Sequence, residues 1–209
     1  MTGTTLKQLT TDLLGGAELG DTLFYQLLNI AKNNREGLRP WIILRAEDSE
    51  ETASSGDTFE TMKDLPSDFR RTLTRDTMVL RAGESILRYT QIPFSSRQID
   101  RKRNQVFYID LANSQYALCG SVSKTHVIYL YYIKKSTDIE EATEWVFPSE
   151  YHPILAFDVA VMHKGGIDFD DINARMAQYN GLDARMIERM MIKWDNEMQL
   201  AEQQGVENY

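Results

Sequence analysis

The sequence predicts an α+β fold, a helical bundle formed by N- and C-terminal helices with an inserted antiparallel β subdomain. Apolar residues recur at helical spacing before Asn34 and after Ser149. Runs of β-branched and aromatic residues fill the sequence between them. The strongest run is His126 to Ile133, whose composition suits a strand covered on both faces. The expected boundaries are residues 1–40 and 137–202 for the bundle, 41–136 for the β subdomain and 203–209 for a C-terminal tail.

Bulk composition limits the classes of function. The chain has 209 residues, which is enough for a sizeable core, and its net charge of -8 argues against attraction of the whole molecule to nucleic acid. The single cysteine, Cys119, excludes an intramolecular disulfide and is expected to be a buried thiol. No apolar run approaches the ~18 residues that cross a bilayer, and no signal-peptide pattern opens the chain. We therefore expect no membrane partner and synthesis in the cytoplasm.

The N-terminal part predicts two short helices. Leucines share one helical face between residues 6 and 14, and Gly15-Gly16 stops the pattern as a C-terminal cap does. A second helix is expected to begin with a cap at Asp21 or at the glycine before it, and its apolar pattern ends at Asn34. Pro40 then bars helix continuation, so the next four residues are expected to form a short buried strand.

The middle of the chain predicts a loop followed by strands. Residues 47–60 are acidic and rich in serine and threonine, so we expect an exposed loop. In the segment that follows, Ser67 can cap a helical turn. Partners for the strand at His126 to Ile133 are expected in four further runs: Met78 to Leu80, Ser85 to Ile92, Val106 to Leu111 and Gln115 to Cys119.

The C-terminal part predicts helices again. Residues 137–140 match a capping box, which indicates a short helix. Ser149 opens the next helix, which has Pro153 in its first turn and so few polar residues that it must be buried on most sides. A last long helix opens near Asp168, and Gly181 is expected to bend or break it.

The sequence predicts no cofactor, no metal ion and no enzymatic activity. The three histidines lack close metal-ligand spacing, and residues 168–171 lack the glycine and the bidentate acid of a calcium loop. No phosphate-binding glycine loop, nucleophile elbow or zinc-protease motif occurs. A small hydrolase that uses His152, Asp158 and His163 is the enzymatic alternative.

Two loops of opposite charge suggest a contact between copies of the chain. The basic loop from Arg97 onward contains Arg101, Lys102 and Arg103, and the acidic loop contains Glu50 and Glu51. If copies lie side by side in a ring, head-to-tail contacts can pair the two loops of neighbours. Contact with phosphate is the second interpretation of the basic loop.

Two short segments and a tyrosine-rich β block carry a family resemblance. The segments are Leu65-Pro66-Ser67-Asp68-Phe69-Arg70-Arg71 and Pro148-Ser149-Glu150-Tyr151-His152-Pro153-Ile154-Leu155. The β block contains Val106 to Asp110 and Val127 to Tyr132. With the order of the elements, they make the chain resemble the head-to-tail adaptor (connector) proteins of tailed bacteriophages. The resemblance covers most of the chain and brings no catalytic residues with it.

The resemblance implies a structural role in the virion. Members of this family form rings, commonly of twelve subunits, below the portal at the capsid vertex, where they extend the DNA channel and provide a platform for the tail. The implied partners are further copies of the chain, the portal protein, a tail or nozzle protein, and genomic DNA that passes without sequence-specific binding. The implied location is the head-tail junction of the virion, with the host cytoplasm during assembly.

The family's C-terminal extension, which docks on the portal, would here be the segment from Met198 to Tyr209, with Met198, Val206 and Tyr209 as anchors. A tail-side nozzle or tail-completion subunit is the structural alternative, because it differs only in its neighbours.

Overall fold

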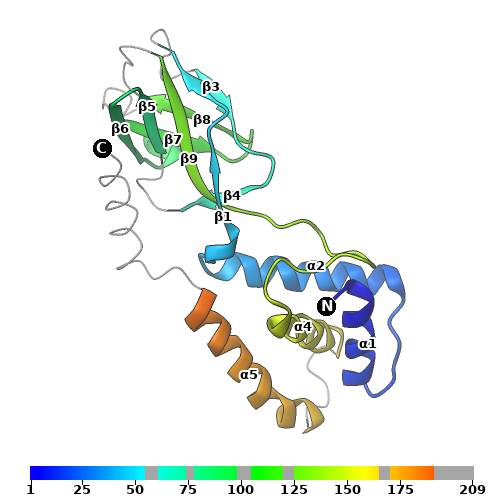
Figure 1. The fold of residues 1–209 in the computed structure, drawn as a ribbon. Helices are drawn as coiled ribbons and strands as arrows, with labels where there is room; N and C mark the ends of the chain where they lie inside the picture. Colours follow the sequence, from blue (N-terminus) through cyan, green and yellow to red (C-terminus); the bar gives the residue numbers. More distant parts are fainter. Residues whose placement is uncertain (55–60, 74–77, 98–104, 120–124, 165–169, 191–209) are drawn as a thin grey trace. The chain divides into compact units, whose positions relative to one another are not determined.

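The computed structural model of the chain describes residues 1–54, 61–73, 78–97, 105–119, 125–164 and 170–190 (Figure 1). The chain divides into two compact units. Unit 1 is Met1–Leu44 with the chain from Ser136 onward, and unit 2 is the continuous stretch Arg45–Lys135. All the α-helices belong to unit 1 and all the strands to unit 2, within the described residues.

The prediction of a helical bundle with an inserted antiparallel β subdomain is wrong. The described residues form a mixed α+β protein with a large, curled nine-stranded sheet and four α-helices. The sheet is larger than predicted because residues 45–72, expected to be mainly loop and turn, contribute four strands: β1 Arg45–Asp48, β2 Thr52–Ala53, β3 Met62–Asp64 and β4 Phe69–Thr72. Strand pairing uses backbone groups, so a segment with few apolar side chains can pair when its polar side chains reach solvent.

The five strands predicted from composition are confirmed, with small shifts at their ends. They are β5 Met78–Ala82, β6 Ser85–Gln91, β7 Val106–Asp110, β8 Gln115–Cys119 and β9 His126–Lys134. The order across the sheet is β1-β9-β5-β6-β7-β8-β3, and β2 and β4 also pair with β9. The pairs are antiparallel except β6 with β7, which is parallel.

Strand β9 is the centre of the pairing. Its residues 130–133 pair with β1 and 132–134 with β4, so β1 and β4 lie along opposite edges of β9. The strands β2 and β5 both pair with Val127 of β9, so they too lie along opposite edges of β9. The prediction that all partners of β9 come from residues 78–119 is therefore wrong, because only β5 does.

The main core of unit 2 lies on one face of the sheet. Its buried residues come from most of the strands and from the connection between β3 and β4: Ala53, Leu65, Phe69, Met78, Leu80, Tyr89, Phe107, Ile109, Tyr116, Leu118, Ile128, Leu130 and Tyr132. A smaller cluster that includes Val106, Ala117 and Cys119 covers the other face of β7 and β8. The predicted buried thiol of Cys119 is confirmed.

Unit 1 is built around α4 (Pro153–Lys164), which packs against α1 (Gly3–Leu13), α2 (Asp21–Leu38) and α5 (Asp170–Met190) (Figure 1). The 3-10 helices η1 (Ile42–Leu44) and η3 (Ser149–Tyr151) flank the segments that join helices and sheet. As predicted, α4 is buried along most of its length and Pro153 lies in its first turn, where its missing N–H breaks no helical bond.

The predicted cap of the first helix is confirmed. Gly15 and Gly16 both have positive φ, 71° and 89°. The Gly15 N–H donates to the Asp12 carbonyl (3.2 Å) and the Gly16 N–H to the Thr11 carbonyl (2.9 Å). These are the two bonds of a Schellman motif, which satisfies the last carbonyls of α1.

Other local predictions differ from the structure. Helix α2 continues past Asn34 to Leu38, because the polar residues of its last turns have buried partners within unit 1. The four residues after Pro40 contain a 3-10 turn rather than a strand. Ser67 lies in the turn before β4, residues 137–147 are irregular, and α5 runs through Gly181 without a break.

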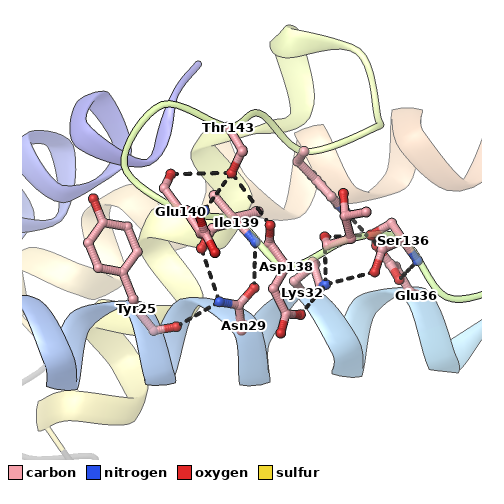
Figure 2. Close-up of polar contacts among 11 residues, drawn as sticks. Tyr25, Asn29, Lys32, Glu36, Ser136, Asp138, Ile139, Glu140 and Thr143 are labelled. Carbon is pink, nitrogen blue, oxygen red and sulfur yellow. Dashed lines mark hydrogen bonds and ion pairs between the residues drawn. The ribbon is translucent and has the colours of Figure 1, made fainter.

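A polar clasp on α2 holds the chain where it returns from β9 (Figure 2). Asn29, Lys32 and Glu36 lie three and four residues apart, so they share one helical face. Lys32 is fully buried, and its ammonium donates to the carbonyls of Ser136 (3.1 Å) and Thr137 (2.9 Å) and to the Asp138 carboxylate (2.8 Å).

Glu36 completes the clasp as its acceptor. Its carboxylate is equally buried and accepts from the N–H and the hydroxyl of Ser136 and from the Trp145 indole N–H (2.9 Å). Asn29 donates to the Ile139 carbonyl (3.1 Å) and accepts from the Ile139 N–H (2.8 Å). The clasp therefore satisfies backbone groups of a segment that belongs to no helix or strand.

We expect Lys32→Met to lower the free energy of unfolding of unit 1 by about 2 to 4 kcal/mol, because two carbonyls and a carboxylate lose a buried donor. Urea unfolding followed by tryptophan fluorescence measures this, since no tryptophan lies in unit 2. Asn34→Met, on an exposed position of the same helix, is the control and should change stability by less than about 0.5 kcal/mol. Equal effects of the two variants would contradict the role of the clasp.

We expect opposite effects from alanine at two helical glycines. A Cβ on Gly3 would lie 2.2 Å from the Glu140 carbonyl oxygen, whereas a Cβ on Gly181 would meet nothing within 4 Å. Gly3→Ala should therefore destabilise unit 1 by about 1 to 3 kcal/mol, and Gly181→Ala should stabilise it by about 0.5 to 1 kcal/mol. The same fluorescence measurement compares them, and a stabilising Gly3→Ala would contradict the close approach.

Candidate interaction surface

Unit 2 carries an acidic hollow of about 460 Å³. Its lining contains six carboxylates and four other residues: Glu47, Asp48, Glu50, Glu51, Asp64 and Asp68, with Leu65, Pro66, Ser67 and Tyr132. No lysine or arginine belongs to this lining. A concave surface lined by one sign of charge concentrates the electrostatic field, so the acidic hollow suits a cationic partner and repels phosphate.

Two stretches of chain form the walls of the acidic hollow. One runs from β1 into β2, and the other is the connection between β3 and β4. Asp48 lies opposite Leu130 of β9, a core residue, and Tyr132 is itself a core residue. These two residues of the acidic hollow therefore lie on the core-bearing side of the sheet. Glu47 pairs with Tyr131, and Asp64 pairs with Gln115, so the register places these two carboxylates on the other side.

Backbone hydrogen bonds fix both walls. The Ile128 N–H of β9 donates to the Glu51 carbonyl (2.9 Å). On the other wall the Leu65 N–H donates to the Ser114 carbonyl (2.8 Å) in the turn between β7 and β8, and the Leu65 side chain is buried. The carboxylates thus project from an ordered backbone, which reduces the conformational entropy lost when a partner binds.

One buried tyrosine, Tyr132, lines the acidic hollow, and a second, Tyr116, lies close to two of its carboxylates. The Tyr132 hydroxyl donates to the Asp68 carboxylate (2.7 Å), and burial, followed by this hydrogen bond and the charge of Asp68, raises the pKa of Tyr132. Burial also raises the pKa of Tyr116, with smaller contributions from the charges of Glu51 and Asp48. The Tyr116 hydroxyl has no hydrogen-bond partner among the described residues.

The predicted contact residues divide into two groups. Glu50 and Glu51 line the acidic hollow, where the structure joins them to four further acids. The basic residues Arg101, Lys102 and Arg103 and the anchors Met198, Val206 and Tyr209 lie outside the described residues, so their roles stay predictions. The predicted loop 47–60 differs in its first half, where Glu47 and Asp48 belong to β1 and two later residues form β2.

The residues of the hydrolase alternative have separate partners. His152 is buried, with Nε2 2.6 Å from the Phe147 carbonyl oxygen and Nδ1 3.1 Å from that of Met1. Both oxygens of Asp158 accept from the Arg35 guanidinium (2.6 and 2.7 Å). His163 is exposed at the end of α4. The hydrogen bonds of His152 and Asp158 therefore join elements of unit 1 and do not connect the two side chains.

Arg35 also donates to Asp183 of α5 (2.7 Å), so one guanidinium joins α2, α4 and α5. Its hydrogen bond to Asp158 and the charges of both carboxylates outweigh burial and raise the pKa of Arg35. This geometry gives Asp158 a role in helix packing, because a carboxylate that accepts two guanidinium bonds is held in one orientation.

Within the described residues, neither the requirements of a metal site nor those of a membrane-spanning helix are met. In those residues no group of three or more histidine, cysteine, aspartate or glutamate side chains is placed to hold a metal ion. No described helix has the length and hydropathy to cross a membrane.

Sequence reasoning missed two of the six carboxylates of the acidic hollow. Asp64 and Asp68 lie outside the acidic stretch 47–60, and they reach Glu50 and Glu51 only through strand pairing. Recognising the strand Met62–Asp64 before the Leu65-Pro66 turn would have indicated their position. A strand of three residues, however, is too short for its alternation of apolar and polar residues to be recognised in the sequence.

Comparison of the chain with protein-family models gives no match, and comparison with curated proteins gives none either.

We expect Tyr116→Phe to leave the stability of unit 2 unchanged or slightly higher at neutral pH, because it removes a buried hydroxyl without a partner. The raised pKa of Tyr116 adds a pH effect. The stability that this raised pKa gives to the folded state is fully present below about pH 10. It is lost as the pH rises further, because the unfolded chain releases the Tyr116 proton at a lower pH than the folded chain does.

Above about pH 10 the free energy of unfolding of the wild type should therefore fall by about 1.4 kcal/mol per pH unit more than that of Tyr116→Phe. Urea unfolding followed by circular dichroism at several pH values measures the difference. Parallel pH profiles of the two proteins would contradict it.

Proposed function

We propose that this chain is a subunit of the head-to-tail adaptor ring of a tailed bacteriophage, which binds the portal, extends the DNA channel and provides the platform for tail attachment. The observation that carries the proposal is where the two segments of the family resemblance lie. Leu65 to Asp68 form one wall of the acidic hollow, and the segment from Pro148 to Leu155 forms η3 and the start of α4. One segment thus builds an interaction surface, and the other the entry to the central helix of unit 1.

Charge supports the same proposal. The net charge of -8 suits a conduit that repels phosphate and lets the genome slide past. The acidic hollow adds a place where a neighbouring protein with basic side chains can bind. A ring of identical subunits needs such heterologous contacts, in which one surface of a copy meets a different surface of the next.

The neighbours of the ring define the remaining parts of the proposal. The C-terminal segment from Met198 to Tyr209 would dock on the portal, and the opposite side of the ring would receive a tail or nozzle protein. The tail-side alternative places the same chain one position further from the capsid.

Electron microscopy of virions that carry an affinity label on this chain tests the proposal. The expected result is a labelled ring between portal and tail. Label at the distal end of the tail would support a nozzle subunit instead. Virions without label would refute both structural roles.

We expect deletion of residues 198–209 to abolish binding to the portal protein of the same phage, because it removes all three predicted anchors. Surface-immobilised portal and a concentration series of the chain measure the binding. Gln203→Ala with Gln204→Ala is the matched control, since it changes the same segment but keeps the anchors. Binding retained after the deletion, with unfolding of both units unchanged, would refute portal docking through this segment.

A further inference from the structure

The sheet of unit 2 has an outer face whose charge is opposite to that of the acidic hollow. On β9 the residues Ile128, Leu130 and Tyr132 belong to the core, so Tyr129 and Tyr131 point to the other face of the sheet. The strand register then places three arginines of neighbouring strands on the same face as these tyrosines.

The register fixes the position of each arginine. Arg81 of β5 lies opposite Val127, and Arg88 of β6 lies opposite Val79, which itself pairs with Tyr129. Glu47 of β1 pairs with Tyr131 and so lies on this face, and Arg45, two residues before it, lies there too. We call these five residues the arginine-tyrosine face: Arg45, Arg81, Arg88, Tyr129 and Tyr131.

The residue types of the arginine-tyrosine face and their exposure are typical of a protein–protein contact. All three arginines are exposed and both tyrosines are half-buried. The Arg81 guanidinium lies 4.9 Å from the centroid of the Tyr129 ring, and such stacking leaves the edge of the guanidinium available for carboxylates. Arginine and tyrosine are also the residue types that most often dominate the energy of protein interfaces.

The acidic hollow supplies the complementary surface. Its Asp48 and Tyr132 lie on the core-bearing side of the sheet, opposite to the arginine-tyrosine face. Its Glu47, which pairs with Tyr131 and hydrogen-bonds it, lies on the side of the arginine-tyrosine face, so the two surfaces adjoin there within one copy. Close to Glu51 and Asp48, but outside the lining of the acidic hollow, the fully buried Tyr116 hydroxyl has no hydrogen-bond partner among the described residues. Two different complementary surfaces on one unit can pair between copies and so produce head-to-tail association.

We propose that the arginine-tyrosine face of one copy binds the acidic hollow of the next copy and forms the subunit contact of the assembly. This inference rests on the proposed ring and deepens it, because it assigns the basic partner of Glu50 and Glu51 to residues of the sheet. Nucleic acid is the competing occupant of the arginine-tyrosine face. The six carboxylates of the acidic hollow and the net charge of -8 favour a second copy.

Charge reversal of each surface, alone and in combination, tests the contact. The face variant is Arg81→Glu with Arg88→Glu, and the hollow variant is Glu50→Lys with Glu51→Lys. Each variant alone brings like charges together, so its dissociation constant for self-association at low salt should rise at least about tenfold.

A mixture of the two variants should recover association. The reversed face of the first variant then meets the reversed hollow of the second, and the unchanged face of the second meets the unchanged hollow of the first. Sedimentation velocity over a concentration series measures all four samples, with the wild type as reference. Added salt should weaken the wild-type contact, because exposed charges are screened.

Arg185→Glu with Arg189→Glu is the control for net charge, since it makes the same charge change on exposed positions of α5. It should leave self-association close to that of the wild type. Circular dichroism establishes that each variant is folded.

Three results would overturn the inference: a wild type that stays monomeric at every concentration, a folded face variant that associates like the wild type, or a mixture that does not recover. A face variant that loses only binding to a labelled single-stranded oligonucleotide would identify a nucleic-acid surface instead. None of these results alters the adaptor proposal, which depends on where the chain lies in the virion.

Discussion

Unit 1 depends on two buried charges, those of Lys32 and Glu36. Their hydrogen bonds join residues that are 104 and 100 positions apart in sequence, because all the residues of the sheet come between α2 and the returning segment along the chain. That segment has no regular structure, so its backbone groups need partners from elsewhere. Apolar side chains at these two positions could pack but could not satisfy those groups. The ammonium and the carboxylate do both, which explains why a helix face otherwise suited to apolar residues carries ionic ones.

The sequence was informative where packing leaves a periodic pattern. The buried helix α4 and the strands β5 to β9 have recognisable runs of apolar residues, and each was predicted. The cap at Gly15-Gly16 was predicted from its residue type. The strands β1 to β4 were not, because they are short and polar, and they pair through backbone groups that every residue has. The error in fold class follows from this one omission, since without these four strands the sheet looks like a small insertion between helices.

The candidate surfaces were predictable only in part, for a related reason. Glu50 and Glu51 stand out in an acidic stretch, and sequence reasoning chose them as contact residues. Asp64 and Asp68 join them only because β3 pairs with β8 while β1 pairs with β9. The arginines at positions 45, 81 and 88 are far apart in sequence, and only the register of four strands places them on one face. A sheet thus sorts charges by side in a way that linear spacing does not reveal.

The division of the chain into a continuous unit and a discontinuous one has a consequence for its synthesis. Unit 2 is a single stretch from Arg45 to Lys135, so it has all its residues as soon as β9 has left the ribosome. Helices α1 and α2 emerge first but must wait for α4 and for the segment that Lys32 binds, 104 residues later. At translation rates of roughly 5 to 20 residues per second, this delay is about 5 to 20 s. During this time the surfaces of α1 and α2 that pack on α4 lack that partner, so the nascent chain is exposed to aggregation and to chaperones.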